Sequence, residues 1–161
     1  MKNEFELKFD PKTIEHLGVK MYSTLPPALA ELISNAYDAD SSKVKIMFHE
    51  QNGKPISIQV VDDGYGMSAL DIQNKFLVIG RNRRMDDGDE PSPKYERLPT
   101  GKKGLGKLAL FGLAKVVTID STKELLRNRI SLDWDKLLGA KGIYNPETKL
   151  RDVDSEKKME R

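Results

Sequence analysis

Three polar residues, Glu31, Asn35 and Asp38, recur at helical spacing in the stretch LPPALAELISNAYDAD. At about 100° per residue they form one stripe on a helix, beside an apolar stripe that faces the core. A carboxylate such as Glu31 can act as a general base on water, and the amide oxygen of Asn35 can bind a hard cation such as Mg²⁺. The stripe fits one wall of a ligand pocket, and a solvated helix face explains the same spacing.

The stretch VVDDGYGM places Asp62, Gly64 and Gly66 directly after an apolar run. Because glycine has no Cβ, Gly64 and Gly66 let the backbone approach a flat ligand closely. A carboxylate at a strand end, such as that of Asp62, can accept a hydrogen bond from an exocyclic amine like that of adenine. An ordinary turn is the alternative, since Asp-Gly is a common turn pair.

A glycine-rich stretch, TGKKGLGKLALFG, leads into an apolar segment. A glycine-rich loop before a helix N-terminus presents unpaired N–H groups and the positive end of the helix dipole, which together bind anions. Gly101, Gly106 and Lys107 nearly match the G-x-x-x-x-G-K pattern of a P-loop, but Leu108 stands where a Ser or Thr should hold magnesium. The stretch is compatible with an anion site and with a flexible hinge ahead of a core helix.

The hydrophobic pattern predicts the elements that position these stretches. Apolar residues at helical spacing predict a helix over residues 25–39. Strands are expected over Lys43–His49 and Ile56–Val61, joined by an Asn-Gly hairpin. A second helix is expected over residues 68–78, with Ser68 as its cap.

The second half of the chain continues to alternate between helices and strands. Residues 81–103 are charged, contain proline and glycine and lack periodicity, so we expect a long mobile loop. Residues 105–114 predict a buried helix, and Lys115–Ser121 and Arg129–Trp134 predict strands. The charged segment from Glu147 to Arg161 is expected to be a solvated helix or a frayed end. The alternation favours a mixed sheet with helices over one face.

Composition narrows the class of protein. The 161 residues are enough for one domain with a real core. With 27 basic and 25 acidic residues, the charge is compatible with a nucleic-acid partner but does not indicate one. The absence of cysteine excludes disulfides and thiolate chemistry. Without a secretory signal or an apolar run of membrane-spanning length, we expect a cytoplasmic protein with no membrane partner.

The three stretches occur in order as E-x-x-x-N-x-x-D-A from Glu31, D-x-G-x-G from Asp62 and G-x-x-G-x-G from Gly101. In this order they resemble the GHKL ATPase superfamily, which includes gyrase B, the large heat-shock chaperones, histidine kinases and MutL. The stretches FDPKTIEHLG, ALAELISNAYDAD, IGRNRR and GKKGLGKLALFGLA are most similar to the MORC-like and bacterial heat-shock-like members. Histidine kinases usually lack the acidic residue at the position of Glu31, so a hydrolase is favoured.

The resemblance implies a Bergerat-type ATP-binding fold, an α/β (α+β) two-layer sandwich whose mixed, mainly antiparallel sheet is covered by helices on one face. It implies ATP and Mg²⁺ as cofactors, Glu31 as the catalytic residue that activates water, and Asn35 as the metal ligand. It places adenine against Asp62 and makes residues of about 81–103 the ATP lid. The other cofactor-binding residues that it implies are Asp38, Gly64, Gly66, Met67, Gly101, Gly104, Leu105, Gly106 and Lys107.

The resemblance also implies a domain arrangement. A GHKL-type ATP-binding domain is expected over residues 1–145, truncated at its C-terminal side, with a charged tail over 146–161. Family members usually carry a later strand whose Thr touches the nucleotide, and a following domain whose Lys reaches the terminal phosphate. Neither is recognised before Arg161, so this fragment alone is expected to be a weak or inactive ATPase.

The implied activity is binding of Mg-ATP and, in the full-length protein, slow hydrolysis with lid closure coupled to dimerisation or conformational change. ATP and ADP are the expected ligands, and an ATP-dependent homodimer of the full-length protein is the expected assembly. A non-hydrolysing ATP sensor and a degenerate interaction domain are the alternatives.

Overall fold

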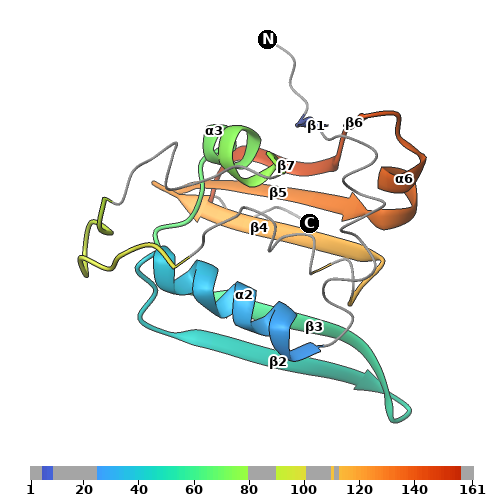
Figure 1. The fold of residues 1–161 in the computed structure, drawn as a ribbon, viewed down its shortest axis with the longest axis horizontal. Coiled ribbons are helices and arrows are strands. Elements are labelled where there is room, and N and C mark those ends of the chain that lie inside the picture. Colours follow the sequence, from blue (N-terminus) through green and yellow to red (C-terminus); the bar gives the residue numbers. More distant parts are fainter. Residues whose placement is uncertain (1–4, 9–24, 80–89, 101–109, 111–112, 157–161) are drawn as a thin grey trace.

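The structure is a computed structural model that describes residues 5–8, 25–79, 90–100, 110 and 113–156. Figure 1 shows the elements along the chain. They are β1 (Leu7–Lys8), α2 (Leu25–Asp38), β2 (Val44–Gln51), β3 (Lys54–Asp62), α3 (Ala69–Asp71), the π-helical turn η1 (Ile72–Phe76), β4 (Val116–Lys123), β5 (Leu126–Asp133), α6 (Trp134–Gly139), β6 (Ile143–Tyr144) and β7 (Glu147–Asp154).

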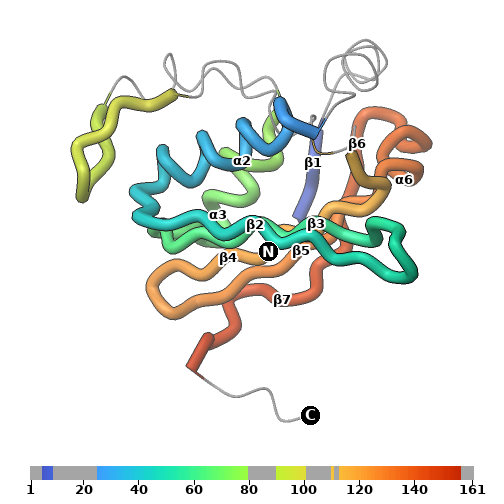
Figure 2. Tube along the Cα trace, turned by 90° about the horizontal axis from the view of Figure 1, so that it is seen from below, coloured from blue at the N-terminus to red at the C-terminus, as the bar shows by residue number. Residues whose placement is uncertain are grey.

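The described strands form three antiparallel sheets. β2 pairs with β3, β5 lies between β4 and β7, and β1 pairs with β6. Helices α2 and α3 lie on the same side of the longer strands in Figure 2. The predicted α+β class is therefore confirmed. The single sheet that was expected is divided, because the described strands β3 and β4 are not hydrogen-bonded neighbours.

The predicted helix over residues 25–39 and the predicted hairpin are both confirmed. In α2, Pro26 and Pro27 lie in the first turn, where a missing N–H costs no intrahelical hydrogen bond. Between β2 and β3, Asn52 and Gly53 have φ values of 53° and 71°. Two consecutive left-handed residues are what a type I′ turn requires, and they match the twist of the paired strands.

The segment predicted as a helix over residues 68–78 is helical, but not uniformly so. Ser68 caps it as expected: its hydroxyl accepts from the Asp71 N–H at 3.1 Å, and the Asp71 carboxylate accepts from the Ser68 N–H at 3.1 Å. After one α-turn the chain widens into η1, where the Leu77 N–H donates to the Ile72 carbonyl at 2.8 Å. Periodicity predicted the helical segment but could not separate these two turn types.

The prediction of a helix or frayed end over residues 147–161 is wrong for residues 147–154, which form strand β7 against β5. Along β7, half-buried Thr148, Leu150 and Val153 are interspersed among exposed charged residues. This near-alternation is typical of a strand with one covered face. The high charge of the segment masked a period-two pattern that was present in the sequence.

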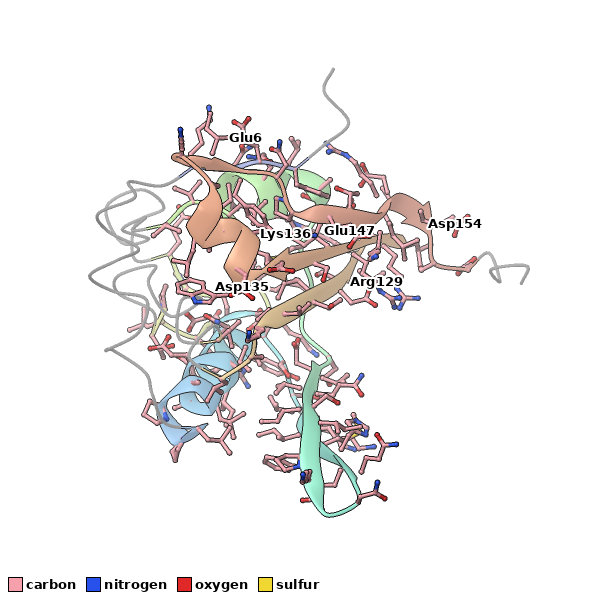
Figure 3. All side chains as sticks on the ribbon, turned by 90° about the vertical axis from the view of Figure 1, so that its right-hand side faces the viewer. Glu6, Arg129, Asp135, Lys136, Glu147 and Asp154 are labelled. Carbon is pink, nitrogen blue, oxygen red and sulfur yellow. The ribbon has the colours of Figure 1, made fainter. Side chains whose placement is uncertain are left out.

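The hydrophobic core lies between β5 and the helical turns α3 and η1. Its buried members are Phe5, Leu7, Ala69, Ile72, Leu77, Ile130, Leu132, Leu137 and Tyr144. The β2–β3 hairpin contributes none of them, and its Phe48, Ile56 and Ile58 are exposed. In Figure 3 this hairpin projects away from the sheet that carries Arg129 and Glu147. Within the described part of the chain, no helix has the length and apolar character needed to cross a membrane.

Candidate functional site

Helix α2 ends in a backbone motif that the sequence analysis did not foresee. The Ser41 N–H donates to the Ala36 carbonyl at 3.0 Å, and the Asp40 N–H donates to the Tyr37 carbonyl at 3.1 Å. Asp40 has a left-handed φ of 58°. These features define a Schellman C-cap with Asp40 at the position that glycine usually occupies. Aspartate tolerates this conformation better than most residues, and the turn fixes the direction of the chain beyond the helix.

The three polar residues predicted on α2 have different surroundings. Asp38 is buried at 5% exposure, Glu31 is half-buried and Asn35 is exposed. The Asp38 carboxylate accepts from the Thr100 N–H at 2.9 Å and from the Thr100 hydroxyl at 2.8 Å. No side-chain hydrogen bond or ion pair joins Glu31 or Asn35 to another described residue. The stripe therefore contains one group engaged by the protein and two that a ligand could engage.

The predicted adenine loop, residues 62–67, lies against the end of α2. The Tyr65 N–H donates to the Ala39 carbonyl at 3.0 Å. A Cβ added to Gly64 would lie 2.7 Å from that same carbonyl oxygen, so glycine permits the contact. Within the loop, Asp62 Oδ1 accepts from the Gly64 N–H at 2.9 Å. The exposed Asp62 carboxylate and helix α2 are thereby brought together.

The other side of this loop rests on β4. Gly66 has a φ of 68°, and a Cβ at this position would lie 2.0 Å from the Thr122 carbonyl oxygen. The Met67 N–H donates to the Ser121 hydroxyl oxygen at 2.7 Å. Protein atoms thus occupy the space that a side chain at Gly66 would need. Packing within the chain accounts for this glycine, while its predicted contact with a ligand remains a prediction.

Asp63 is a residue that the sequence analysis passed over. Its Oδ1 accepts from the Ser41 hydroxyl at 2.7 Å, the Ser42 N–H at 2.7 Å and the Lys43 N–H at 2.9 Å. The Ser42 hydroxyl donates to Oδ2 at 2.5 Å. Hydrogen bonds from the Ser42 and Ser41 hydroxyls hold the pKa of Asp63 well below its ordinary value. No local signal distinguished this structural carboxylate from an ordinary Asp-Gly turn residue.

Residues 90–100 belong to the stretch expected to be a mobile loop. They have the expected irregular structure, but Asp40 holds them to the end of α2. Its carboxylate accepts from the Lys94 N–H at 2.8 Å, the Tyr95 N–H at 3.2 Å and the Ser92 hydroxyl. Burial raises the pKa of Asp40, but these hydrogen bonds outweigh burial and leave the pKa below its ordinary value.

Arg97 also holds this segment to the end of α2. Its guanidinium donates to the Tyr37 carbonyl at 3.1 Å and to the Ser41 carbonyl at 2.8 Å. It also lies over the rings of Tyr37 and Tyr95, at 4.4 and 4.5 Å from their centroids. A planar guanidinium can donate to carbonyl groups and stack on aromatic rings at the same time. We call residues 92–100 the strut.

The remaining predicted site residues are Gly101, Gly104, Leu105, Gly106 and Lys107, which lie outside the described residues. For the implied magnesium ion, Asn35 offers an exposed amide oxygen. The described part of the chain holds no group of three or more His, Cys, Asp or Glu side chains suited to a metal. Magnesium commonly keeps several waters and binds through one or two protein oxygens together with substrate phosphates. A single Asn35 ligand fits that mode of binding.

Comparison with known proteins identifies the class. Residues 22–159 match the family described as histidine kinase-, DNA gyrase B-, and HSP90-like ATPases. The match covers most of the chain, so this protein belongs to that family of GHKL ATPases. Membership in the family implies ATP binding.

Similar proteins come from distant organisms. Over 120 residues, 74% of this chain, it is 35% identical to a putative type II restriction enzyme, HgiDII, of Herpetosiphon aurantiacus. It is 29% identical over 62% of its length to the human structural maintenance of chromosomes flexible hinge domain-containing protein 1. It is 27% identical over 67% of its length to the DNA mismatch repair protein MutL of Limosilactobacillus fermentum. The aligned parts cover 18%, 5% and 16% of these relatives.

Proposed function

We propose that this chain is the nucleotide-binding part of a magnesium-dependent ATPase, with Glu31, Asn35 and Asp62 as its central site residues. The observation that carries the proposal is the position of the loop of residues 62–67. The Tyr65–Ala39 hydrogen bond holds this loop against helix α2, which carries Glu31 and Asn35. The proposed adenine acceptor, magnesium ligand and general base thereby belong to one connected unit.

Each residue has a distinct proposed task. Asp62 Oδ2 has no hydrogen-bond partner among the described residues, so it can accept from an adenine amine while Oδ1 holds the Gly64 N–H. Asn35 contributes an amide oxygen to magnesium, which supplies positive charge next to the phosphates when it is bound. Glu31 is half-buried and accepts a proton from the attacking water. Phosphoryl transfer depends mainly on such positioning and charge stabilisation.

Calorimetric titration of the 161-residue chain with ATP, with and without Mg²⁺, tests the binding site. We expect saturable binding that needs Mg²⁺ for full affinity and weakens about tenfold or more in Asp62→Asn, because the amide presents a donor where the adenine amine needs an acceptor. Asp135→Asn is a matched control, since this exposed carboxylate lies on α6. Equal affinity of the two variants would contradict the proposed role of Asp62.

We further propose that the full-length protein hydrolyses ATP slowly, with lid closure coupled to dimerisation, and that this activity serves a DNA-linked process. The three relatives are named for restriction, chromosome maintenance and DNA mismatch repair. Those three names support the DNA link.

Steady-state phosphate release by the full-length protein tests this second step. Glu31→Ala is expected to lower turnover by about 100-fold or more, as loss of a general base does, while ATP binding persists. Duplex DNA should raise turnover of the wild type, and ATP should shift its elution toward a dimer in size-exclusion chromatography. Binding without any turnover in the wild type would favour a non-hydrolysing ATP sensor instead.

A further inference from the structure

The side chain of Asp38 faces protein rather than an open site. Its Oδ1 accepts both the backbone N–H and the hydroxyl of Thr100, and the carboxylate is buried at 5% exposure. The Thr100 hydroxyl also lies within hydrogen-bond distance of the Ser34 hydroxyl, one turn earlier on α2. Because the Thr100 proton goes to Asp38, Ser34 is the donor in that contact. Two side chains of helix α2, those of Asp38 and Ser34, therefore hydrogen-bond to Thr100.

The contrast with Asn35 is informative because both residues belong to the same helix. Asn35 is exposed and its side chain bonds to no other described residue, so a ligand from solvent can reach it. Asp38 is buried and its Oδ1 already accepts two hydrogen bonds. If this carboxylate gave up these hydrogen bonds to bind a ligand, the Thr100 N–H and hydroxyl would lose their acceptor, which is costly.

Thr100 has a special place along the chain. It ends the strut, which Asp40 and Arg97 hold to the same end of α2, and the next residue in the sequence is Gly101, the first glycine of the predicted phosphate-binding stretch. We propose that Asp38 is a positioning residue that fixes Thr100, the residue that precedes this stretch in the sequence, relative to Glu31 and Asn35. This inference rests on the proposed function, and it replaces direct nucleotide contact as the role of Asp38.

A double-mutant cycle between Asp38 and Thr100 tests the inference in the 161-residue chain. Asp38→Ala and Thr100→Val are each expected to weaken Mg-ATP binding, by about tenfold and about threefold. The first removes the acceptor of both hydrogen bonds from Thr100, whereas the second removes the hydroxyl and keeps the N–H bond. The double variant should lose clearly less than the product of the two single losses, because both substitutions break the Asp38–Thr100 contact. Calorimetry measures the four affinities, and chemical denaturation confirms that each variant is folded.

Two further readouts separate positioning from a purely structural role. Affinity for adenosine should be unchanged in Asp38→Ala, since adenosine lacks the phosphates and the loop of residues 62–67 does not depend on this side chain. Thr118→Val, the same chemical change on β4, where the hydroxyl contacts Ser131 at 3.3 Å, should leave ATP affinity unchanged. If Asp38→Ala does not fold, Asp38→Asn is used: it keeps an oxygen for Thr100, so near wild-type ATP affinity is expected.

The outcomes that overturn the inference differ from those that overturn the proposed function. Independent, multiplicative losses in the cycle would mean that Asp38 contacts the nucleotide directly, and the proposed function would stand without this inference. Loss of ATP binding in Asp38→Asn at wild-type stability would have the same meaning. Failure of the wild type to bind Mg-ATP at all would overturn the proposed function together with the inference.

Discussion

Two segments meet at the C-terminal end of α2, and the protein holds them there by opposite means. The loop of residues 62–67 is fitted by shape: a Cβ at Gly64 or Gly66 would lie within 2.7 Å of a neighbouring carbonyl oxygen. The strut of residues 92–100 is held by charge: Asp40 accepts two backbone N–H groups, and Arg97 donates to two carbonyl groups.

This difference predicts how each segment responds to change. A side chain added at Gly64 or Gly66 should destabilise the loop, because the close-packed carbonyl groups beside it cannot move aside at low cost. A charge-held strut fails when its acceptor is neutralised, and therefore depends on pH. Substitutions that add volume should therefore destabilise the loop of residues 62–67, and substitutions that remove charge should destabilise the strut.

The largest expected effect is that of Gly66→Ala, compared with Gly53→Ala in the hairpin. Both glycines have left-handed φ values, but Gly53 has nothing within 4 Å of an added Cβ, whereas Gly66 would meet the Thr122 carbonyl oxygen at 2.0 Å. The backbone term alone should cost Gly53→Ala about 1 kcal/mol. Gly66→Ala should cost at least about 3 kcal/mol, because overpacking adds to that term.

Urea denaturation of the two glycine variants measures this comparison. A similar loss of stability in both would show that the contact with Thr122 is not tight and that backbone conformation alone explains Gly66. The hairpin variant is a close control because Gly53 lies in a type I′ turn far from the predicted site.

A smaller effect is expected for Asp40→Asn, which tests the strut. The Lys94 and Tyr95 N–H groups donate to different oxygens of Asp40. Asparagine keeps one acceptor oxygen and presents its N–H₂ group to the other donor, so the unfolding midpoint should fall at neutral pH. The pKa of Asp40 in the folded chain lies below its ordinary value of 3.8. The stabilisation from the charged form is therefore complete above that value and is lost as the pH falls below it.

Denaturation midpoints from about pH 7 to about pH 3 check both parts of this expectation. The gap between the wild type and Asp40→Asn should narrow as the pH falls below the ordinary aspartate value. Asp135→Asn is the control: its carboxylate is 68% exposed and lies 3.5 Å from Lys115, and exposed pairs of this kind contribute little. If the difference in midpoint between the wild type and Asp40→Asn does not change with pH, the charge of Asp40 does not hold the strut.

The sequence was sufficient to predict elements whose signals are local. The helix from Leu25, the Asn52-Gly53 hairpin and the Ser68 cap each follow from residues close together in the chain. The resemblance to GHKL ATPases depended on three short stretches, and the family comparison confirms it. Strand β7 was missed because its charge concealed its near-alternation.

The contacts that assemble the site could not be predicted in the same way. Asp40 and Lys94 are 54 residues apart, and Asp38 and Thr100 are 62 residues apart, so no window of sequence contains both partners. Asp63 is also surrounded by residues that fit an ordinary turn. A carboxylate that binds a ligand and one that binds a distant N–H have the same local sequence, and the fold is needed to distinguish them.

Among the described residues, the loop of residues 62–67 hydrogen-bonds both to the end of helix α2 and to strand β4. On one side Tyr65 bonds to Ala39 at the end of α2, and on the other Met67 bonds to Ser121 of β4, next to the main core. A displacement of the helix relative to this sheet would therefore change the hydrogen bonds of these six residues. A ligand bound to these residues would stabilise the position of the helix relative to the sheet. It would also affect β4 without touching that strand.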